Sequence, residues 1–208
     1  MYSPPAFREE RLETLHALIE SHRLGTLVTH SDNGLAANLV PFSLDRGRGP
    51  HGTLRAHLAR ANDQFAALKS GGELLVIFQG PETYITPSWY PSKREHGKVV
   101  PTWNYVMVQV VGRPVVIEDP AWLLAQIGEL TDAKEGARPA PWAVNDAPDA
   151  YVAAQLKGIF GIEIAIERIE GKWKTSQNRP EGDRHGVAEG LTAEGAAEMA
   201  ALVARRPD

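Results

Sequence analysis

The chain has 208 residues, of which 43% are hydrophobic and 23% are charged, as is typical of one soluble globular domain. Its net charge of −4 argues against a direct DNA reader, because such proteins usually present a basic surface to the phosphates. The absence of cysteine excludes disulfides and thiolate metal sites, and no apolar run reaches the roughly 18 residues of a membrane helix. The N-terminus lacks the pattern of a signal peptide, so a cytoplasmic location without a membrane partner is expected.

The first half of the chain predicts one helix followed by antiparallel strands. Leu12, Leu15 and Leu18 recur at helical spacing within a helix predicted over residues 8–21. The turn signal Ser31-Asp-Asn-Gly34 predicts a hairpin between the strands on either side of it. Strands are predicted over residues 25–30, 35–44, 53–58, 73–79 and 83–85, with a short helix over 64–69.

The second half predicts two further strands and three helices. Residues 87–101 contain too many proline, lysine and glycine residues for regular structure. Strands are predicted over 102–117 and 160–169, and helices over 120–132, 147–157 and 191–206. The whole pattern predicts an α+β fold with an antiparallel barrel or twisted sheet, in one domain over 1–208 with a helical tail from about 191. Neither of the common phosphate-loop motifs is found, so a Rossmann or P-loop fold is not expected.

The most informative segment runs from Lys172 to Arg179. It contains three cations, four hydrogen-bonding side chains and one tryptophan, directly after the last predicted strand. Lysine and arginine bind phosphate, whereas hydroxyl and amide groups offer donors and acceptors together. The segment therefore suits a phosphorylated heteroaromatic ligand, although a solvated loop after a strand is the open alternative.

Two other groups of residues could bind a ligand. Arg55 and His57 share one face of a predicted strand, and Arg60 and Asn62 follow at the strand-to-helix turn. The alternative is a histidine at the edge of the core with surface arginines. The second group is aromatic: Trp89, Tyr90, Pro101, Trp103 and Tyr105 could stack on a planar ligand or fill a core beneath a long loop. The polar neighbour Asn104 favours a site near Trp103.

No motif identifies a catalytic residue. The histidines show neither an i,i+4 pair nor the spacing of a zinc protease, so no metal is expected. No serine lies in a nucleophile-elbow pattern, and the carboxylates are scattered.

Several motifs together resemble the PaiB family, FMN-binding proteins described as negative transcriptional regulators. The motifs extend from position 1 to about 191. They are Met1-Tyr-x-Pro4, Leu24-Gly-Thr-Leu-Val28, His57-Leu-Ala-Arg-Ala-Asn62, Tyr84-Ile-x-Pro-x-Trp-Tyr90, Val100-Pro-Thr-Trp-Asn-Tyr105, Gly161-Ile-Glu-Ile164, and Lys174-x-Ser-Gln-Asn-Arg179 leading to Asp183-Arg184. The resemblance implies an FMN-binding split β-barrel that forms a homodimer with the flavin sites at the subunit interface.

The resemblance also implies a set of cofactor-binding residues. Arg60, Lys174 and Arg179 are the candidates for the phosphate, and Asn104, Gln177 and Asn178 for the pyrimidine edge or the ribityl hydroxyls. The complete set is Thr26, Leu27, Val28, Asn38, His57, Arg60, Asn62, Trp103, Asn104, Lys174, Ser176, Gln177, Asn178 and Arg179.

Three functions remain open from the sequence. The first is an FMN-dependent sensor or regulator, as the family description implies. The second is an FMN-dependent oxidoreductase acting on a small molecule, and the third is haem binding on the same barrel with a histidine such as His57 as ligand. No basic recognition helix is visible, so any regulation is expected to work through a partner or a metabolite.

Overall fold

The computed structural model describes residues 1–205, and backbone contacts divide the chain into two compact units. One unit, which we call the terminal unit, consists of residues 1–15, 79–108 and the chain from Glu170 onward. The other, which we call the hairpin unit, consists of residues 16–78 and 109–169 and contains the hairpin of β2 (Leu24–Ser31) and β3 (Gly34–Pro41). The prediction of a single domain over 1–208 stays a prediction, and Arg206 to Asp208 lie outside the described residues.

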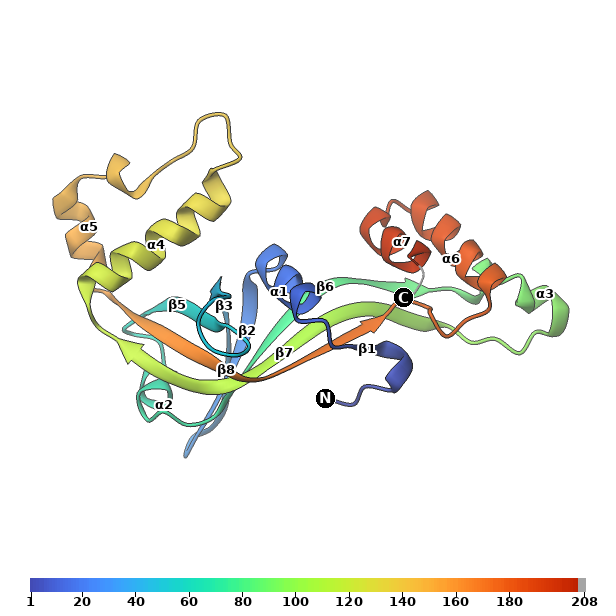
Figure 1. Cartoon of the computed structure of the whole chain (residues 1–208), viewed down its shortest axis with the longest axis horizontal. Helices are drawn as coiled ribbons and strands as arrows, with labels where there is room; N and C mark the ends of the chain where they lie inside the picture. Colours follow the sequence, from blue (N-terminus) through green and yellow to red (C-terminus); the bar gives the residue numbers. More distant parts are fainter. Residues whose placement is uncertain (206–208) are drawn as a thin grey trace. The chain divides into compact units, whose positions relative to one another are not determined.

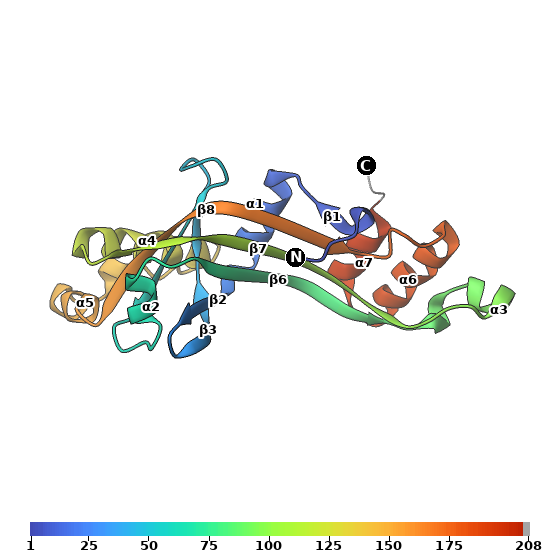
Figure 2. The same cartoon turned by 90° about the horizontal axis from the view of Figure 1, so that it is seen from below.

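The strands form one antiparallel sheet. Its order begins with β3 and ends with β4, and these two strands are not paired with each other, so the sheet is open rather than closed into a ring (Figures 1 and 2). Its order is β3-β2-β6-β7-β8-β5-β4, and β1 pairs separately with β8. The remaining strands are β1 (Arg8–Glu9), β4 (Ser43–Asp45), β5 (Thr53–Ala59), β6 (Leu74–Ile85), β7 (Thr102–Ile117) and β8 (Ile159–Lys174). Together with the helices that flank the sheet, this arrangement confirms the predicted α+β fold of the split β-barrel class.

The helices lie mostly in the connections between strands. The α-helices are α1 (Leu12–Ser21), α2 (Phe65–Lys69), α3 (Ser92–His96), α4 (Pro120–Glu135), α5 (Asp149–Leu156), α6 (Glu181–Ala193) and α7 (Ala197–Ala204). Short 3₁₀ helices are η1 (Pro5–Phe7), η2 (Pro87–Trp89) and η3 (Val144–Asp146). Within residues 1–205, no helix is both long and apolar enough to cross a membrane.

The hairpin unit has an apolar core beneath its strands. Leu27, Phe42 and Phe78 are fully buried, and the rings of Phe42 and Phe78 meet edge to face at 5.7 Å. Helix α4 packs on β5 and β8 because Gly161 of β8 has no side chain: a Cβ there would come within 2.2 Å of the Trp122 ring. The position of α4 on this part of the sheet therefore depends on one glycine.

The terminal unit has its own apolar cluster, formed mainly by α6 and α7, which lie side by side (Figure 1). Trp89 packs against α6, where a Cβ at Gly190 would lie 2.4 Å from the indole ring. The cluster consists of Ile85, Tyr90, Val187, Leu191, Met199, Ala200 and Val203. The cluster explains why the C-terminal segment is helical. As helices, α6 and α7 can place their apolar residues on one side, against the end of β6 and the η2 turn of the same unit.

Several elements differ from the predictions. The segment 87–101, predicted to lack regular structure, contains η2 and α3. The predicted strands 73–79 and 83–85 are one continuous strand, β6, and the predicted strand 35–44 is divided between β3 and β4. Residues 8–9 are not helical, because they pair with β8 as strand β1, with Arg8 opposite Lys172. Strand β8 continues to Lys174 rather than ending at 169. The tail predicted as one helix is divided between α6 and α7, because Gly195 adopts a φ of 80° that a continuing helix does not allow.

Candidate functional site

Lys172 and Lys174 lie on the last part of β8 and flank the same aromatic ring. Their Nζ atoms are 5.3 and 6.0 Å from the ring centre of Tyr105 on β7. Lys172 is only 8% exposed, and its Nζ donates a hydrogen bond to the carbonyl of Tyr2 at 3.0 Å. Because side chains two residues apart on a strand share a face, the longer β8 aligns both ammonium groups along this part of the sheet.

The environment of Lys174 disfavours its positive charge. Its Nζ donates to Thr102 Oγ1 at 2.5 Å. Burial lowers the pKa of Lys174 below its ordinary value of 10.5, and the positive charges of Lys172 and Arg179 add to this effect, while Tyr105 opposes it. A bound anion would reverse the balance, because it attracts the charges that now repel one another.

Arg179 completes a group that we call the cation cluster: Lys172, Lys174 and Arg179. Its guanidinium lies over the ring of Tyr90 at 4.8 Å. Within residues 1–205, none of the three side chains forms an ion pair with a carboxylate; the ion pairs of the terminal unit involve other residues. Three neighbouring cations without an ion-pair partner form a candidate site for an anion.

The turn after β8 is strained at a buried serine. Ser176 has a φ of 64°, the only positive φ of a non-glycine residue in the described chain, and is 3% exposed. It accepts a hydrogen bond from Nδ2 of the buried Asn104 at 2.9 Å. The Asn104 Oδ1 has no partner within the described structure. Strained residues and unpaired buried polar atoms are typical of ligand sites, and this atom is an acceptor open to an N–H donor.

The other predicted residues of this segment are placed differently. Gln177 folds back on its own turn, where its side chain bonds the Thr175 N–H at 2.7 Å and the Trp173 carbonyl. Asn178 is exposed. Trp103 is 52% exposed and meets Tyr84 edge to face at 6.0 Å.

In the hairpin unit, β2 and β3 bring together four predicted residues: Thr26, Leu27, Val28 and Asn38. Leu27 pairs with Asn38 in the antiparallel register. The Asn38 Nδ2 donates to Oε1 of Gln64 at 2.9 Å, and the Gln64 Nε2 reaches the Leu27 carbonyl at 3.1 Å and the Thr29 hydroxyl at 3.0 Å. Asn62 belongs to the same network, since its Oδ1 accepts from the backbone N–H of Gln64.

His57 and Arg60 are engaged with groups of their own unit. The His57 Nδ1 forms a hydrogen bond with the side-chain amide of Gln126 on α4, at 2.7 Å from its Oε1. The Gln126 Nε2 is buried without a partner. Arg60 forms an ion pair with Glu118 at 2.5 Å and donates to the Lys157 carbonyl at 3.1 Å. Arg60 is thus already neutralised, unlike the cation cluster.

Seven predicted residues lie in each unit: positions 26, 27, 28, 38, 57, 60 and 62 in the hairpin unit, and 103, 104, 174, 176, 177, 178 and 179 in the terminal unit. Sequence reasoning missed Thr102, Gln64 and Gln126. Gln64 could have been found, because it is a polar residue at the start of the helix predicted over 64–69, close to the ligand candidate Asn62. No group of three or more possible metal ligands occurs among residues 1–205.

Comparisons with known proteins identify the family of this chain. The chain matches the model of the family described as "Putative FMN-binding domain" over residues 1–168. It is 32% identical over 206 residues to the protease synthase and sporulation protein PAI 2 of Bacillus subtilis, with 98% of this chain and 96% of that protein covered. The chain belongs to the PaiB family. FMN is the cofactor of this family, which confirms the cofactor predicted from the sequence.

Solved structures agree with the fold of this PaiB-family chain. A conserved protein from Mycobacterium tuberculosis aligns with a TM-score of 0.61 at 13% identity, covering 87% of this chain and 95% of that one. An FAD- and haem-binding protein from Mycobacterium smegmatis aligns with a TM-score of 0.59 at 18% identity, covering 80% of this chain and 73% of that one. At such identities the likeness concerns the fold alone.

The residues of this PaiB-family chain fit FMN in two respects. The cation cluster offers charges for the phosphate without first breaking an ion pair. The unpaired Asn104 Oδ1 is an acceptor for an N–H group such as the one on the flavin pyrimidine ring. The family match ends at residue 168, before the cation cluster, whereas the alignment with PAI 2 covers nearly the whole chain.

Proposed function

We propose that the chain is a cytoplasmic, homodimeric FMN protein that acts as a flavin-dependent sensor or regulator. The observation that carries the proposal is the cation cluster, in which three positive charges surround Tyr105 and Tyr90 without a carboxylate partner among the described residues. Phosphate is the part of FMN that requires such charges. Family membership supplies the flavin as the specific ligand.

The other parts of the cofactor have matching groups in the chain. Lys174 and Arg179 would bind the phosphate, and Asn104 would accept from the pyrimidine N–H. Within the hairpin unit, the network around Gln64 fixes the backbone of β2 and β3. Bound FMN supplies hydride and electron transfer, whereas the protein residues bind it, orient it and keep water away.

The edge strand β3 supports a homodimer. It is the last strand of the sheet order and carries no charged residue. Leu35 and Leu39 are 76% and 65% exposed. An apolar edge strand without protecting charges tends to pair with another chain, so a second copy is its natural partner. We expect Leu39→Lys to convert a dimer into a monomer in sedimentation velocity; an unchanged dimer would place the interface elsewhere.

The relative PAI 2 is named a protease synthase and sporulation protein, and the sporulation in that name favours a regulatory role over a purely metabolic one. An FMN-dependent oxidoreductase is the second candidate, favoured by one specific observation. Beside Tyr105 lies a pocket of about 250 Å³ lined by Gln79, Glu82, Trp103, Tyr105 and Met107. Aromatic and thioether side chains next to the cation cluster could hold a planar substrate.

A spectrum of the purified protein, followed by titration, tests the proposal. We expect flavin absorption bands, and we expect FMN to bind at least about tenfold more tightly than riboflavin, because charge-assisted contacts to phosphate exist only for FMN. A Soret band in place of flavin bands would indicate haem, and equal affinity for the two flavins would refute the phosphate site. Catalytic bleaching by NADH or NADPH would favour the oxidoreductase, and salt-sensitive retention on DNA would indicate direct regulation.

A further inference from the structure

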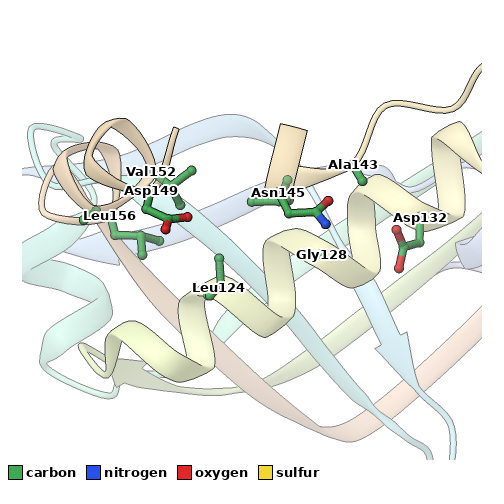
Figure 3. Close-up of a pocket in the computed structure, with 10 residues that line it drawn as sticks. Leu124, Gly128, Asp132, Ala143, Asn145, Asp149, Val152 and Leu156 are labelled. Atoms are coloured by element: carbon green, nitrogen blue, oxygen red, sulfur yellow. The ribbon is translucent and has the colours of Figure 1, made fainter. Parts of the chain in front are cut away.

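A second pocket lies in the hairpin unit, between α4, η3 and α5, and none of the predicted flavin residues lines it. Its volume is about 550 Å³, within the range of small-molecule sites. The lining is mostly apolar, and Figure 3 shows Leu124 of α4 pointing toward the side on which α5 presents Val152 and Leu156. The complete lining is Leu124, Gly128, Asp132, Ala143, Val144, Asn145, Asp149, Val152, Ala153 and Leu156.

The α4 wall of this pocket is held in place from its opposite face. Leu124, Gly128 and Asp132 are spaced by four residues and therefore share one face of the helix. On the other face, Trp122 donates to Glu163 at 2.9 Å, and Gln126 and Glu129 bond His57 and Arg55 at 2.7 and 2.8 Å. A wall anchored in this way exists before any ligand arrives.

The opposite wall is poorly packed. No residue of α5 is buried, and only Val152 and Leu156, both of which line the pocket, are partly covered. An isolated helix of this length is unstable in water, so α5 depends on what fills the space between it and α4. An apolar body in the pocket would bury the faces of both helices at once.

The rim of the pocket is acidic. Asp132, Asn145 and Asp149 are exposed lining residues, and their side chains form no hydrogen bond or ion pair within residues 1–205. Among the described residues, no cation lines the pocket; of those close in sequence, Arg138 is paired with Glu135 at 3.1 Å, and Lys134 and Lys157 are exposed. Two free carboxylates beside an apolar cavity attract a positive group and repel a fatty acid or another anion.

We propose that the α4–α5 pocket binds a small amphiphilic cation, that is, an aliphatic or aromatic body carrying a protonated amine. The apolar body lies between Leu124 and Leu156, and the ammonium group faces Asp132 and Asp149. This site does not depend on flavin binding. Its occupation stabilises α5 against α4.

Three probes with one aromatic body and different head groups test the charge: naphthylethylammonium, naphthylethanol and naphthylacetate. In calorimetric titrations of the full chain, we expect the cation to bind about three- to tenfold more tightly than the alcohol, as two exposed carboxylates allow, and the acid to bind least. Hydrogen exchange should slow over residues 149–156 when the cation is bound. Asp132→Asn with Asp149→Asn should bring the affinities for cation and alcohol together.

A blocking variant tests the location. A Cβ at Gly128 meets no atom within 4 Å, so Gly128→Phe can fill the pocket without a clash, and replacing a glycine favours the helix. Gly182 at the start of α6 is equally open, so Gly182→Phe is the matched control. We expect G128F to abolish probe binding and G182F to keep it.

The possible failures are distinct. Binding that survives in G128F, or an alcohol that binds as tightly as the cation, overturns the proposal. If no probe binds and G128F changes the sedimentation coefficient, the pocket is covered by a second copy, and the proposal is also wrong.

Discussion

The arginines of the hairpin unit and the cation cluster of the terminal unit use the same charge in opposite ways. Arg48 and Arg55 both approach the buried carboxylate of Glu163, at 2.5 and 3.7 Å, and Arg60 is paired with Glu118. Lys172, Lys174 and Arg179 lie instead among aromatic rings, hydroxyls and carbonyls. Paired cations hold a fold together, whereas unpaired ones retain their attraction for a ligand.

This difference separates stability from binding in the same chain. Removing a paired charge leaves its partner uncompensated, which destabilises the folded state. Removing an unpaired, partly buried charge relieves a cost of folding but takes away a ligand contact. The following predictions test whether the two regions divide these roles as the geometry indicates.

The largest effect is expected from Glu163→Ala. Glu163 accepts hydrogen bonds from Arg48 and from Trp122, and it is 8% exposed. Although burial alone raises its pKa, these donors outweigh burial and hold the pKa of Glu163 below its ordinary value. We expect the free energy of unfolding in urea to fall by about 2–3 kcal/mol, with the FMN affinity of the folded fraction unchanged.

Glu167→Ala is the control for that variant. Glu167 lies on the same strand, but it is half exposed and 3.7 Å from Arg113, so its loss should cost less than about 1 kcal/mol. Equal losses for the two variants would show that the Glu163 network has no special role.

The second effect concerns binding. We expect Lys174→Ala with Arg179→Ala to weaken FMN binding about 100-fold, because two charge-assisted phosphate contacts are lost. Riboflavin affinity should stay the same, because riboflavin lacks the phosphate. Arg94→Ala with Lys98→Ala removes two exposed cations of the same unit and should change neither affinity. A parallel loss for both flavins in fluorescence titration would show that the cluster acts on the protein structure instead.

Local patterns in the sequence were enough to predict much of the fold. Strand β7 runs from Thr102 to Ile117 as predicted, because buried and less buried residues alternate over most of its length. Strand β8 was predicted too short, since Gly171 and two lysines resemble a loop. The strand continues because β1 pairs with it from the other end of the chain, with Glu9 opposite Gly171. A pairing of this sequence separation has no local signature.

The same limit applies to the site. The Lys172–Arg179 segment was recognised from its residue types, but no pattern shows whether a cation has a partner. Arg60 meets Glu118 across 58 positions, which only the fold reveals. The assignments of individual residues to FMN therefore stay predictions. Because Arg60 already has an ion-pair partner, Lys174 and Arg179 are the stronger candidates for the phosphate.

A third, smaller effect concerns the turn that holds Asn104. The backbone of Ser176 is left-handed, a conformation that costs a side-chain-bearing residue about 1 kcal/mol and glycine almost nothing. Ser176→Ala and Ser176→Gly both lose the hydroxyl that Asn104 contacts, so their difference sets the backbone strain against the larger entropy of glycine in the unfolded chain. We expect strain to dominate and the glycine variant to be up to about 1 kcal/mol more stable than the alanine variant in urea unfolding. A less stable glycine variant would indicate an unstrained turn in solution.

The smallest effect is a pH dependence that should have opposite signs for folding and for binding. Because the pKa of Lys174 is lowered in the folded state, the unfolded chain holds its proton to higher pH. The stability of the flavin-free protein should therefore rise as pH increases through the lowered pKa, up to the ordinary value of 10.5. FMN binding should weaken over the same window, because the phosphate prefers the protonated amine.

Lys174→Met identifies the group responsible, because it keeps the length and apolar stem of the side chain without the charge. The difference between the pH profiles of wild type and variant removes the contribution of all other titrating groups. We expect this difference to show rising stability and falling FMN affinity together in the wild type, measured by urea unfolding and by fluorescence titration. If stability and FMN affinity instead both fell with rising pH, the charge of Lys174 would support folding, as the paired cations of the hairpin unit do. The contrast between the two regions would then fail at its central residue.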